Sequence, residues 1–246
     1  MYNVKAQQNF FRGNNTYVAT PTATSPTAPN ALNFSGGDDI VLATNDTKFK
    51  LNVGTIEGWI KTSNAGSGYC GLFGKTFAYF LYLSNNTLSV YDWAAAANKS
   101  TGILLNDDKW HHVALSFNSG NSNSTFIYID GVLRLTTTLT IQNQNEPFTI
   151  GSNNYNQPYV GNIDDVRVWN VQRTQSDIQT FMNQELPGNE SGLIAYYTFN
   201  QGIASGNNTT ITTILDKTNN ALNGALNGFT KNGAFSNFVE GKVPSN

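Results

Sequence analysis

The chain has 246 residues, of which 12% are charged, and its formal net charge is −2. This charged fraction is about half of the ~25% that soluble domains usually carry, and Asn, Thr, Ser and Gly supply the polarity instead. The sequence has no basic stripe that could neutralise phosphates, which excludes nucleic acid as a partner. No apolar run approaches the roughly 20 residues of a membrane-spanning helix, so no membrane insertion is expected. The single cysteine, Cys70, rules out an internal disulfide, and we interpret it as a small buried apolar residue.

The first thirty residues differ in composition from the rest. Residues 4–6 (Val-Lys-Ala) resemble the tail of a bacterial export signal whose upstream part is missing, and an ordinary polar terminus is the alternative. Residues 20–29 are rich in Pro and Thr, which predicts an extended linker because proline lacks a backbone donor. We therefore expect residues 1–30 to form an extended N-terminal segment or linker, and residues 31–246 to form one domain.

Strands follow one another through the first half of this domain. Apolar and β-branched residues separated by short turns predict strands at 31–34, 40–42, 55–61, 70–75, 80–83 and 87–93. Asn85-Asn86 stands between two of these apolar runs and predicts a hairpin turn. Residues 93–100, which include four consecutive alanines, predict a loop or one helical turn at the rim of a sheet.

The second half continues the pattern. Residues 110–117 alternate, so that Val113 and Leu115 share one face while His112 and Ala114 share the other. Asp130-Gly131 between two apolar runs is a strong hairpin signal, because Gly accepts positive φ. Further strands are expected at 163–169 and 192–199, and the segment 214–224 follows them.

One short helix is predicted near residues 174–186. Thr174 offers an N-cap with the acidic Asp177 three positions on. Apolar residues then follow helical spacing as far as Leu186, and Pro187-Gly188 should end the helix.

Three short motifs in this order carry a family resemblance: W-H-H-V at 110–113, I-D-G at 129–131 and G-N-I-D-D-V-R-V-W at 161–169. The series resembles the laminin-G-like jelly-roll family of the concanavalin A-like lectin and glucanase superfamily, which includes the pentraxins. The resemblance covers roughly residues 31–226 and implies an all-β fold, a two-sheet antiparallel jelly-roll sandwich. In many relatives the motifs found here at 196–199 and 216–224 come first in the domain. The order in this chain resembles a circular permutation of that arrangement.

Catalysis is not expected. Glucanases of this superfamily place clustered acidic residues on one strand, and glycoside hydrolysis needs a facing pair of carboxylates. The five glutamates here are scattered along the chain. The neighbours Asp164 and Asp165 should point to opposite faces of a strand, as should His111 and His112, which we interpret as strand residues.

The resemblance also implies a structural Ca²⁺ site between the first turn of the domain and the acidic residue of the D-D-V-R-V strand. The matching positions are Gly37 and Asp38 on one side and Asp164 on the other, with Asp216 able to approach them. Calcium prefers oxygen ligands of this kind. The alternative is that Asp38 and Asp216 form turns and that Asp164 packs through hydrogen bonds.

A second region resembles the calcium-dependent ligand loop of pentraxins, here residues 151–161. Gln157 fits that pattern, but Asn153 and Tyr155 replace the acidic residues, so the pentraxin type of metal site is lost. The loop residues that remain, Asn153, Asn154, Tyr155 and Gln157, could bind a sugar through amides and a ring face. Tyr91 and Trp93 share a face by period two and could form a stacking platform. A polar hairpin loop and ordinary sheet packing are the alternatives.

These observations predict a non-catalytic, extracellular recognition domain that binds carbohydrate, with a structural calcium. The expected partners are a glycan or a surface protein, and the chain could belong to a multidomain or multi-subunit assembly. The expected location is a bacterial cell surface or the extracellular space, with a virion as the alternative. A structural or protein-interaction module of an adhesin or virion appendage is the first alternative function. A glucanase-type hydrolase is the second, which the scattered carboxylates disfavour.

Overall fold

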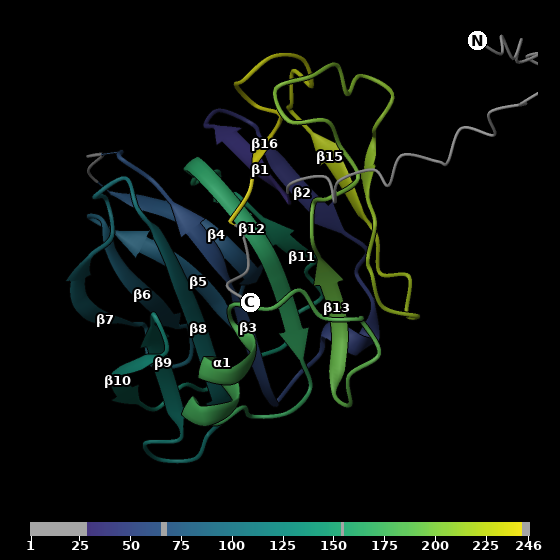
Figure 1. Ribbon diagram of the computed structural model, residues 1–246. Coiled ribbons are helices and arrows are strands. Elements are labelled where there is room, and N and C mark those ends of the chain that lie inside the picture. Colours follow the sequence, from purple (N-terminus) through teal and green to yellow (C-terminus); the bar gives the residue numbers. More distant parts are fainter. Residues whose placement is uncertain (1–28, 65–67, 154, 243–246) are drawn as a thin grey trace, which may run out of the picture.

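The computed structural model describes residues 29–64, 68–153 and 155–242, which form two antiparallel sheets packed face to face (Figure 1). The first sheet contains, in spatial order, β10 (Val132–Thr137), β9 (Thr125–Ile129), β8 (Trp110–Asn118), β3 (Val53–Lys61), β12 (Val160–Trp169), β1 (Asn30–Ser35) and β16 (Phe238–Glu240), and β13 (Leu193–Tyr197) pairs with the second half of β12. The second sheet contains β14 (Thr213–Ile214), β15 (Gly224–Asn227), β2 (Ile40–Ala43), β11 (Phe148–Ile150), β4 (Tyr69–Lys75), β5 (Phe80–Ser84), β6 (Thr87–Asp92) and β7 (Ala97–Leu104). A 3₁₀ turn, η1 (Thr47–Phe49), lies between β2 and β3. The predicted all-β jelly-roll sandwich is confirmed.

One hydrophobic core fills the space between the sheets. β3 and β8 pair along their whole length, and Val113, Leu115 and Phe117 of β8 face this core. The intervening Ala114 faces away from it and packs against Ile178 of the helix. The alternation of β8 therefore gives the first sheet one face buried in the core and a second face partly covered by the helix.

Both predicted hairpin turns are present. Asn85 and Asn86 have φ of 46° and 65°, and Asp130 and Gly131 have φ of 51° and 70°. Two successive positive φ values define the type I′ turn, whose twist matches the strands that it joins. The loop or helical turn predicted for residues 93–100 is shorter than expected. The turn occupies residues 93–96, and residues 97–100 belong to β7 because they pair with β6.

The two ends of the described chain lie side by side. β1 lies beside β16 (Figure 1). Gly241 N donates to Pro29 O at 2.7 Å. Asn30, which we had expected in the linker, is the first residue of β1. The predictions of a linker and of a signal remnant otherwise fall on residues 1–28, which lie outside the described residues.

The predicted helix is present. α1 (Gln175–Phe181) begins at a full capping box in which the Thr174 and Asp177 side chains each accept from the other's backbone N–H. It lies against the outer face of the first sheet (Figure 1). There Ile178 packs on Ala114 and Tyr128. Within the described ranges, no helix combines the length and apolarity required to span a membrane.

The helix ends at Phe181, five residues before the predicted end. In a longer helix the carbonyls of Phe181 and Met182 would accept from backbone N–H groups one turn further on. Here Trp59 Nε1 donates to Met182 O at 2.8 Å, and Arg167 donates to Phe181 O at 2.9 Å. Side chains of the sheet thus satisfy these carbonyls, and Leu186 packs in a separate buried cluster.

Candidate functional site

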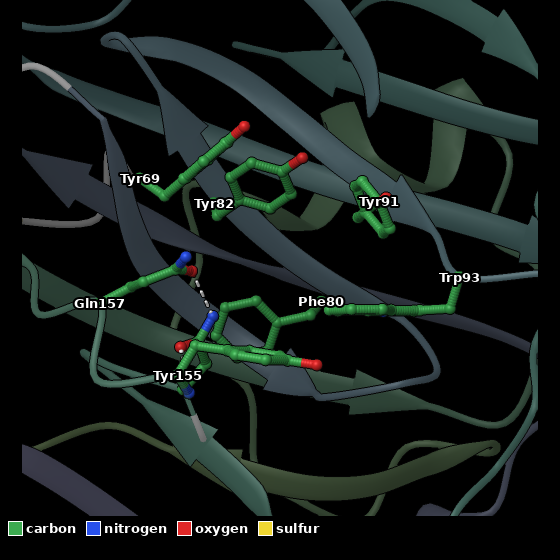
Figure 2. Close-up of a pocket in the computed structure, with 8 residues that line it drawn as sticks. Tyr69, Phe80, Tyr82, Tyr91, Trp93, Tyr155 and Gln157 are labelled. Carbon is green, nitrogen blue, oxygen red and sulfur yellow. Dashed lines mark hydrogen bonds between the residues drawn. The ribbon is translucent and has the colours of Figure 1, made fainter. Parts of the chain in front are cut away.

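Two groups of residues that are distant in sequence meet on the outer face of the second sheet. They line a cavity of about 280 Å³, the aromatic pocket (Figure 2). Its lining residues are Tyr69, Phe80, Tyr82, Tyr91, Trp93, Asn153, Tyr155 and Gln157. The predicted platform residues and the predicted sugar-binding loop therefore belong to one pocket. Asn154, the remaining loop residue of that prediction, lies outside the described residues.

Strand alternation supplies the floor of the aromatic pocket. Leu81 and Leu83 of β5 face the core, so Phe80 and Tyr82 point outward. On the neighbouring strand β4, a Cβ at Gly71 would come within 3.1 Å of the Phe80 ring. Glycine at this position leaves room for the ring and for the loop that follows β11.

Stacked aromatic rings form one wall. The Trp93 and Tyr155 rings are nearly parallel, with an interplanar angle of 11° and centroids 5.5 Å apart. Tyr91 meets Trp93 edge-on at 4.7 Å, and Phe77 packs against both Trp93 and Tyr155. Trp93 lies in the turn after β6, and it joins the strand residues to the loop. Each ring is held by another, so the wall is preformed.

The amide side of the pocket is also fixed. Asn153 Nδ2 donates to Gln157 Oε1 at 2.7 Å, and Asn153 Oδ1 accepts from Tyr155 N at 3.0 Å. Gln157 O accepts from Gly71 N at 2.7 Å, which ties the loop to β4. Among the described residues, nothing accepts from the Gln157 side-chain amide, which therefore remains available to a hydroxyl group of a ligand.

The lining of the aromatic pocket carries no formal charge. All eight lining residues are aromatic or amide residues. Burial, together with the nearby Tyr69 and Tyr91, raises the pKa of Tyr82 well above its usual range, so its hydroxyl stays protonated. That hydroxyl donates to Asn98 Oδ1 at 2.7 Å. The pocket can therefore bind a ligand by ring stacking and by hydrogen bonds from uncharged groups.

Sequence reasoning assigned only part of this site. Tyr69 and Tyr82 were expected in sheet strands, and neither these two nor Phe80 and Phe77 were assigned to a pocket. Alternate residues of β4 and β5 face outward, and this pattern could have identified Tyr69, Phe80 and Tyr82 as pocket residues. Phe77 has φ of 60° in the turn before β5, and no local pattern places its ring beside Trp93.

The predicted calcium ligands are not brought together. Asp38 is exposed in the turn after β1, and Asp164 is buried on β12, where its carboxylate accepts from Lys242 N at 2.8 Å. Asp216 accepts from the backbone N–H groups of Tyr196 and Leu222, each at 2.9 Å, as a turn-forming aspartate does. In the part of the chain that the structure describes, no group of three or more His, Cys, Asp or Glu side chains is placed to hold a metal. The structural calcium stays a prediction.

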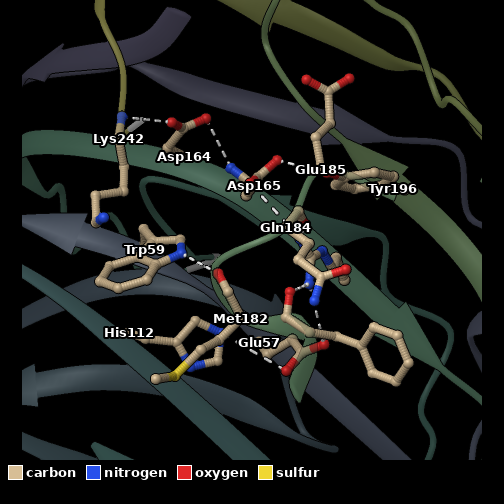
Figure 3. Close-up of polar contacts among 12 residues, drawn as sticks. Glu57, Trp59, His112, Asp164, Asp165, Met182, Gln184, Glu185, Tyr196 and Lys242 are labelled. Carbon is tan, nitrogen blue, oxygen red and sulfur yellow. Dashed lines mark hydrogen bonds and ion pairs between the residues drawn. The ribbon is translucent and has the colours of Figure 1, made fainter. Parts of the chain in front are cut away.

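Asp164 and Asp165 do not point to opposite faces as we expected. The ladder between β12 and β3 has a bulge from Asp164 to Arg167, and Asp165 has φ of 51°. The bulge turns both carboxylates to the same side of the strand, where both are buried (Figure 3). Burial and the neighbouring Asp165 carboxylate raise the pKa of Asp164 well above its usual range.

A buried polar network lies beside this bulge, under the segment that follows α1 (Figure 3). Glu57 Oε1 accepts from Trp169 Nε1 at 2.8 Å, and Arg167 approaches Glu57 at 3.9 Å and Asp165 at 3.6 Å. Burial and then the Arg167 charge lower the pKa of His112 to about 3, so its contact with Glu57 is not an ion pair at neutral pH. The network connects strands to the end of the helix, which is a structural role.

His111, the other half of the predicted histidine pair, is held between two aspartates. Its Nδ1 lies 2.8 Å from Asp130 and its Nε2 lies 3.0 Å from Asp107. Partial burial opposes its charge, but the hydrogen bonds to Asp130 and Asp107 outweigh burial and raise the pKa of His111 above the ordinary 6.5. The hydrogen bond from His111 lowers the pKa of Asp107 to about 2.

This arrangement predicts a stability optimum in mild acid for these groups. The His111 contribution is complete below pH 6.5 and is lost as the pH rises through the raised pKa of the folded state. The Asp107 contribution is present above its ordinary pKa of 3.8 and is lost as the pH falls towards 2. Urea unfolding from pH 4 to 9 should show a decline above pH 6.5 that is smaller in His111→Gln, and NMR titration should give a His111 pKa above 6.5. An equal decline in the variant would contradict the assignment.

The fold and the pocket together define a jelly-roll β-sandwich with an uncharged aromatic pocket on one outer face. The model of the concanavalin A-like lectin/glucanases superfamily matches residues 34–179, and the chain belongs to this superfamily. The predicted family is thereby confirmed. No curated protein sequence matches the chain.

Two solved structures illustrate the likeness in fold. A candidate carbohydrate-binding protein from Bacteroides ovatus is similar with a TM-score of 0.64 and 21% identity, over 82% of this chain and 58% of that protein. The CBM40 domain of the Ruminococcus gnavus IT-sialidase, bound to α2,3-sialyllactose, is similar with a TM-score of 0.51 and 13% identity, over 62% of this chain and 96% of that domain. This chain thus spans just over half of the length of the first protein.

Proposed function

We propose that this protein is a non-catalytic carbohydrate-binding domain and that the aromatic pocket is its binding site. The observation that carries the proposal is the preformed Trp93–Tyr155 wall beside the Gln157 amide. An aromatic face packs against the apolar face of a pyranose ring, while an amide binds the hydroxyl groups at its edge. Membership of a lectin and glucanase superfamily, and likeness in fold to proteins named for carbohydrate binding, support the same function.

The uncharged lining favours a neutral saccharide. An acidic sugar would need a cation in the pocket to offset the cost of desolvating its carboxylate. None of the eight lining residues is charged. Because this lining also carries no carboxylate, we expect sugar binding here to be independent of calcium.

Isothermal titration of the full chain with soluble oligosaccharides tests this function. The panel contains neutral gluco-, xylo-, manno- and arabino-oligosaccharides, with sialyllactose and oligogalacturonate as acidic members. We expect saturable binding of a neutral member, quenching of tryptophan fluorescence and an affinity that EDTA does not change. Chromatography of the sugar after incubation should show no shortening. Absence of binding across the panel, or release of shorter products, would contradict the proposal.

A further inference from the structure

A second cavity, of about 510 Å³, lies at the end of the first sheet. Residues of β1, of β3 and of the start of β12 line it, together with the loop after β3 and the segment before β16. Its lining residues are Asn33, Phe34, Ser35, Lys61, Thr62, Ser63, Asn64, Asp108, Val160, Gly161, Asn162 and Phe235. We call it the polar cleft. Its volume falls within the range of roughly 300–1,000 Å³ that ligand pockets occupy.

A row of polar side chains crosses the strands of the polar cleft. Asn162 pairs in register with Asn33 on one side and with Lys61 on the other. The next residue of β12, Ile163, faces the core together with Ile60. Asn33, Asn162 and Lys61 therefore point to the outer face of the first sheet. The strands that line the polar cleft belong to the first sheet, and those that line the aromatic pocket belong to the second.

The cleft is held in shape by its own hydrogen bonds. Thr62 Oγ1 donates to Val160 O at 2.7 Å, and Asp108 N donates to Thr62 O at 3.0 Å. Lys61 Nζ lies 3.6 Å from the Asp108 carboxylate, and both side chains keep contact with solvent. A ligand would meet side chains that these contacts already hold in place.

The polar row offers donors and an acceptor to a ligand. Asn33 Nδ2 donates to Asn162 Oδ1 at 2.6 Å, and Asn33 Oδ1 accepts from Ser236 N. In the described part of the chain nothing accepts from the side-chain Nδ2 of Asn162. This amide, the Lys61 ammonium and the Asp108 carboxylate can each bind hydroxyl groups, which both donate and accept.

An exposed aromatic ring borders this polar row. Phe235 is 76% exposed, the highest value among the large apolar side chains of the described residues. Its carbonyl accepts from Thr230 Oγ1 at 2.9 Å, so the turn that presents the ring is anchored. A ring beside an amide, a carboxylate and an ammonium group is suited to a polyhydroxylated ring with one apolar face.

We propose that the polar cleft is a second, independent saccharide-binding site, at which Phe235 contacts the ring face and Asn162, Lys61 and Asp108 bind hydroxyl groups. The protein would then hold two glycan segments on opposite faces of the sandwich. On a polysaccharide that presents many such segments, two sites give an avidity that exceeds the affinity of either alone.

A peptide partner fits the cleft less well. An extended peptide would add to a free strand edge, but β1 is paired with β12 and β16, and β12 with β3 and β1. No backbone edge faces the cleft from these two strands. An amphipathic helix would need a continuous apolar groove, and eight of the twelve lining residues here are polar or charged.

Amide chemical shifts of the ¹⁵N-labelled full chain test this site separately from the aromatic pocket. Cellohexaose, xylohexaose, mannohexaose and laminarihexaose are titrated to millimolar concentration against the wild type and against Trp93→Ala. We expect one of them to shift the amides of residues 61–64 and 160–162, equally in both proteins. Adding Phe235→Ala or Asp108→Asn should weaken this response about tenfold or more, while Ile203→Ala, which removes another exposed apolar side chain, should not.

Three results would overturn the second site. These are no shift at residues 61–64 and 160–162 with any sugar, loss of that shift in Trp93→Ala, and an unchanged response in both cleft variants. A failure of the aromatic pocket as a sugar site would instead appear as unchanged amides around residues 91–93 and 153–157. The outcomes at the two cavities are therefore distinguishable. Shifts at the cleft with an unrelated peptide but with no sugar would identify the other class of partner and also overturn the proposal.

Discussion

Replacing Trp93 with alanine is expected to weaken binding of the preferred neutral oligosaccharide at the aromatic pocket by about 30-fold or more. Trp93 contacts Phe77, Tyr91 and Tyr155, so its removal takes away both the contact surface and the support of the other rings. A buried aromatic anchor of a binding site typically contributes at least about 2 kcal/mol, and about 1.4 kcal/mol corresponds to a tenfold change in Kd.

Two further variants separate the ring's role in binding from its role in packing. Trp93→Phe keeps an aromatic face and should recover most of the affinity. Leu104→Ala removes a side chain that is 62% exposed on the neighbouring strand β7 and does not line the pocket, so it should bind as the wild type does. Titration calorimetry gives Kd, and thermal unfolding checks that each variant is folded. Equal affinity in Trp93→Ala and the wild type, with both folded, would remove the pocket from consideration as the binding site.

The features predicted correctly from the sequence are those that depend on neighbouring residues. Asp130-Gly131 forms a type I′ turn wherever two strands meet it, and Thr174 with Asp177 caps a helix through bonds across three residues. The position of the helix end was missed because it depends on Trp59 and Arg167, which are distant in sequence. The local sequence therefore predicted the start of this helix correctly, but not its end, which contacts with other strands determine.

The candidate site follows the same division. Tyr91 and Trp93 were proposed as a platform by period two, and Asn153, Tyr155 and Gln157 were proposed as a loop by resemblance. Their meeting could not be predicted, because it requires the order of strands in the second sheet to place β6 and the β11 loop around β4 and β5. The bulge at Asp165 likewise depends on register with β3, which no local pattern encodes.

The two outer faces of the sandwich differ in what they can accommodate. The second sheet presents outward-facing rings, with Gly71 leaving space beside them. The first sheet carries α1 and a buried ionic network over much of its outer face, and the polar cleft lies only at the end of this sheet. The buried network of Glu57, Asp165 and Arg167 lies on the first sheet, whereas the lining of the aromatic pocket carries no formal charge.

Replacing Arg167 with methionine is expected to lower the free energy of unfolding by about 3–5 kcal/mol, the usual cost of breaking a buried ion pair by removing one partner. Arg167 is 1% exposed and approaches both Glu57 and Asp165. Without it, two buried carboxylates lose their cation, and the carbonyl of Phe181 loses its donor. This loss is a large fraction of the roughly 5–15 kcal/mol by which domains are usually stable.

A double-mutant cycle with Glu57→Gln shows whether charge or packing accounts for this loss. Burial raises the pKa of Glu57 more than the Arg167 charge lowers it, so folding disfavours the ionised form of Glu57 relative to the unfolded chain. The glutamine keeps an oxygen that can accept from Trp169 Nε1, the hydrogen bond that Glu57 makes. We therefore expect Glu57→Gln alone to cost less than Arg167→Met, and the double variant to be more stable than the sum of the two losses predicts.

Urea unfolding at pH 7, followed by circular dichroism, measures all four proteins, and Leu104→Ala serves as the surface control. A loss below about 1 kcal/mol in Arg167→Met would mean that the carboxylates take up protons or water at little cost, and that the network does not hold the helix end. Strict additivity in the cycle would assign the loss to packing of the long side chain. The expected coupling instead assigns it to a buried carboxylate that has lost its neighbouring cation.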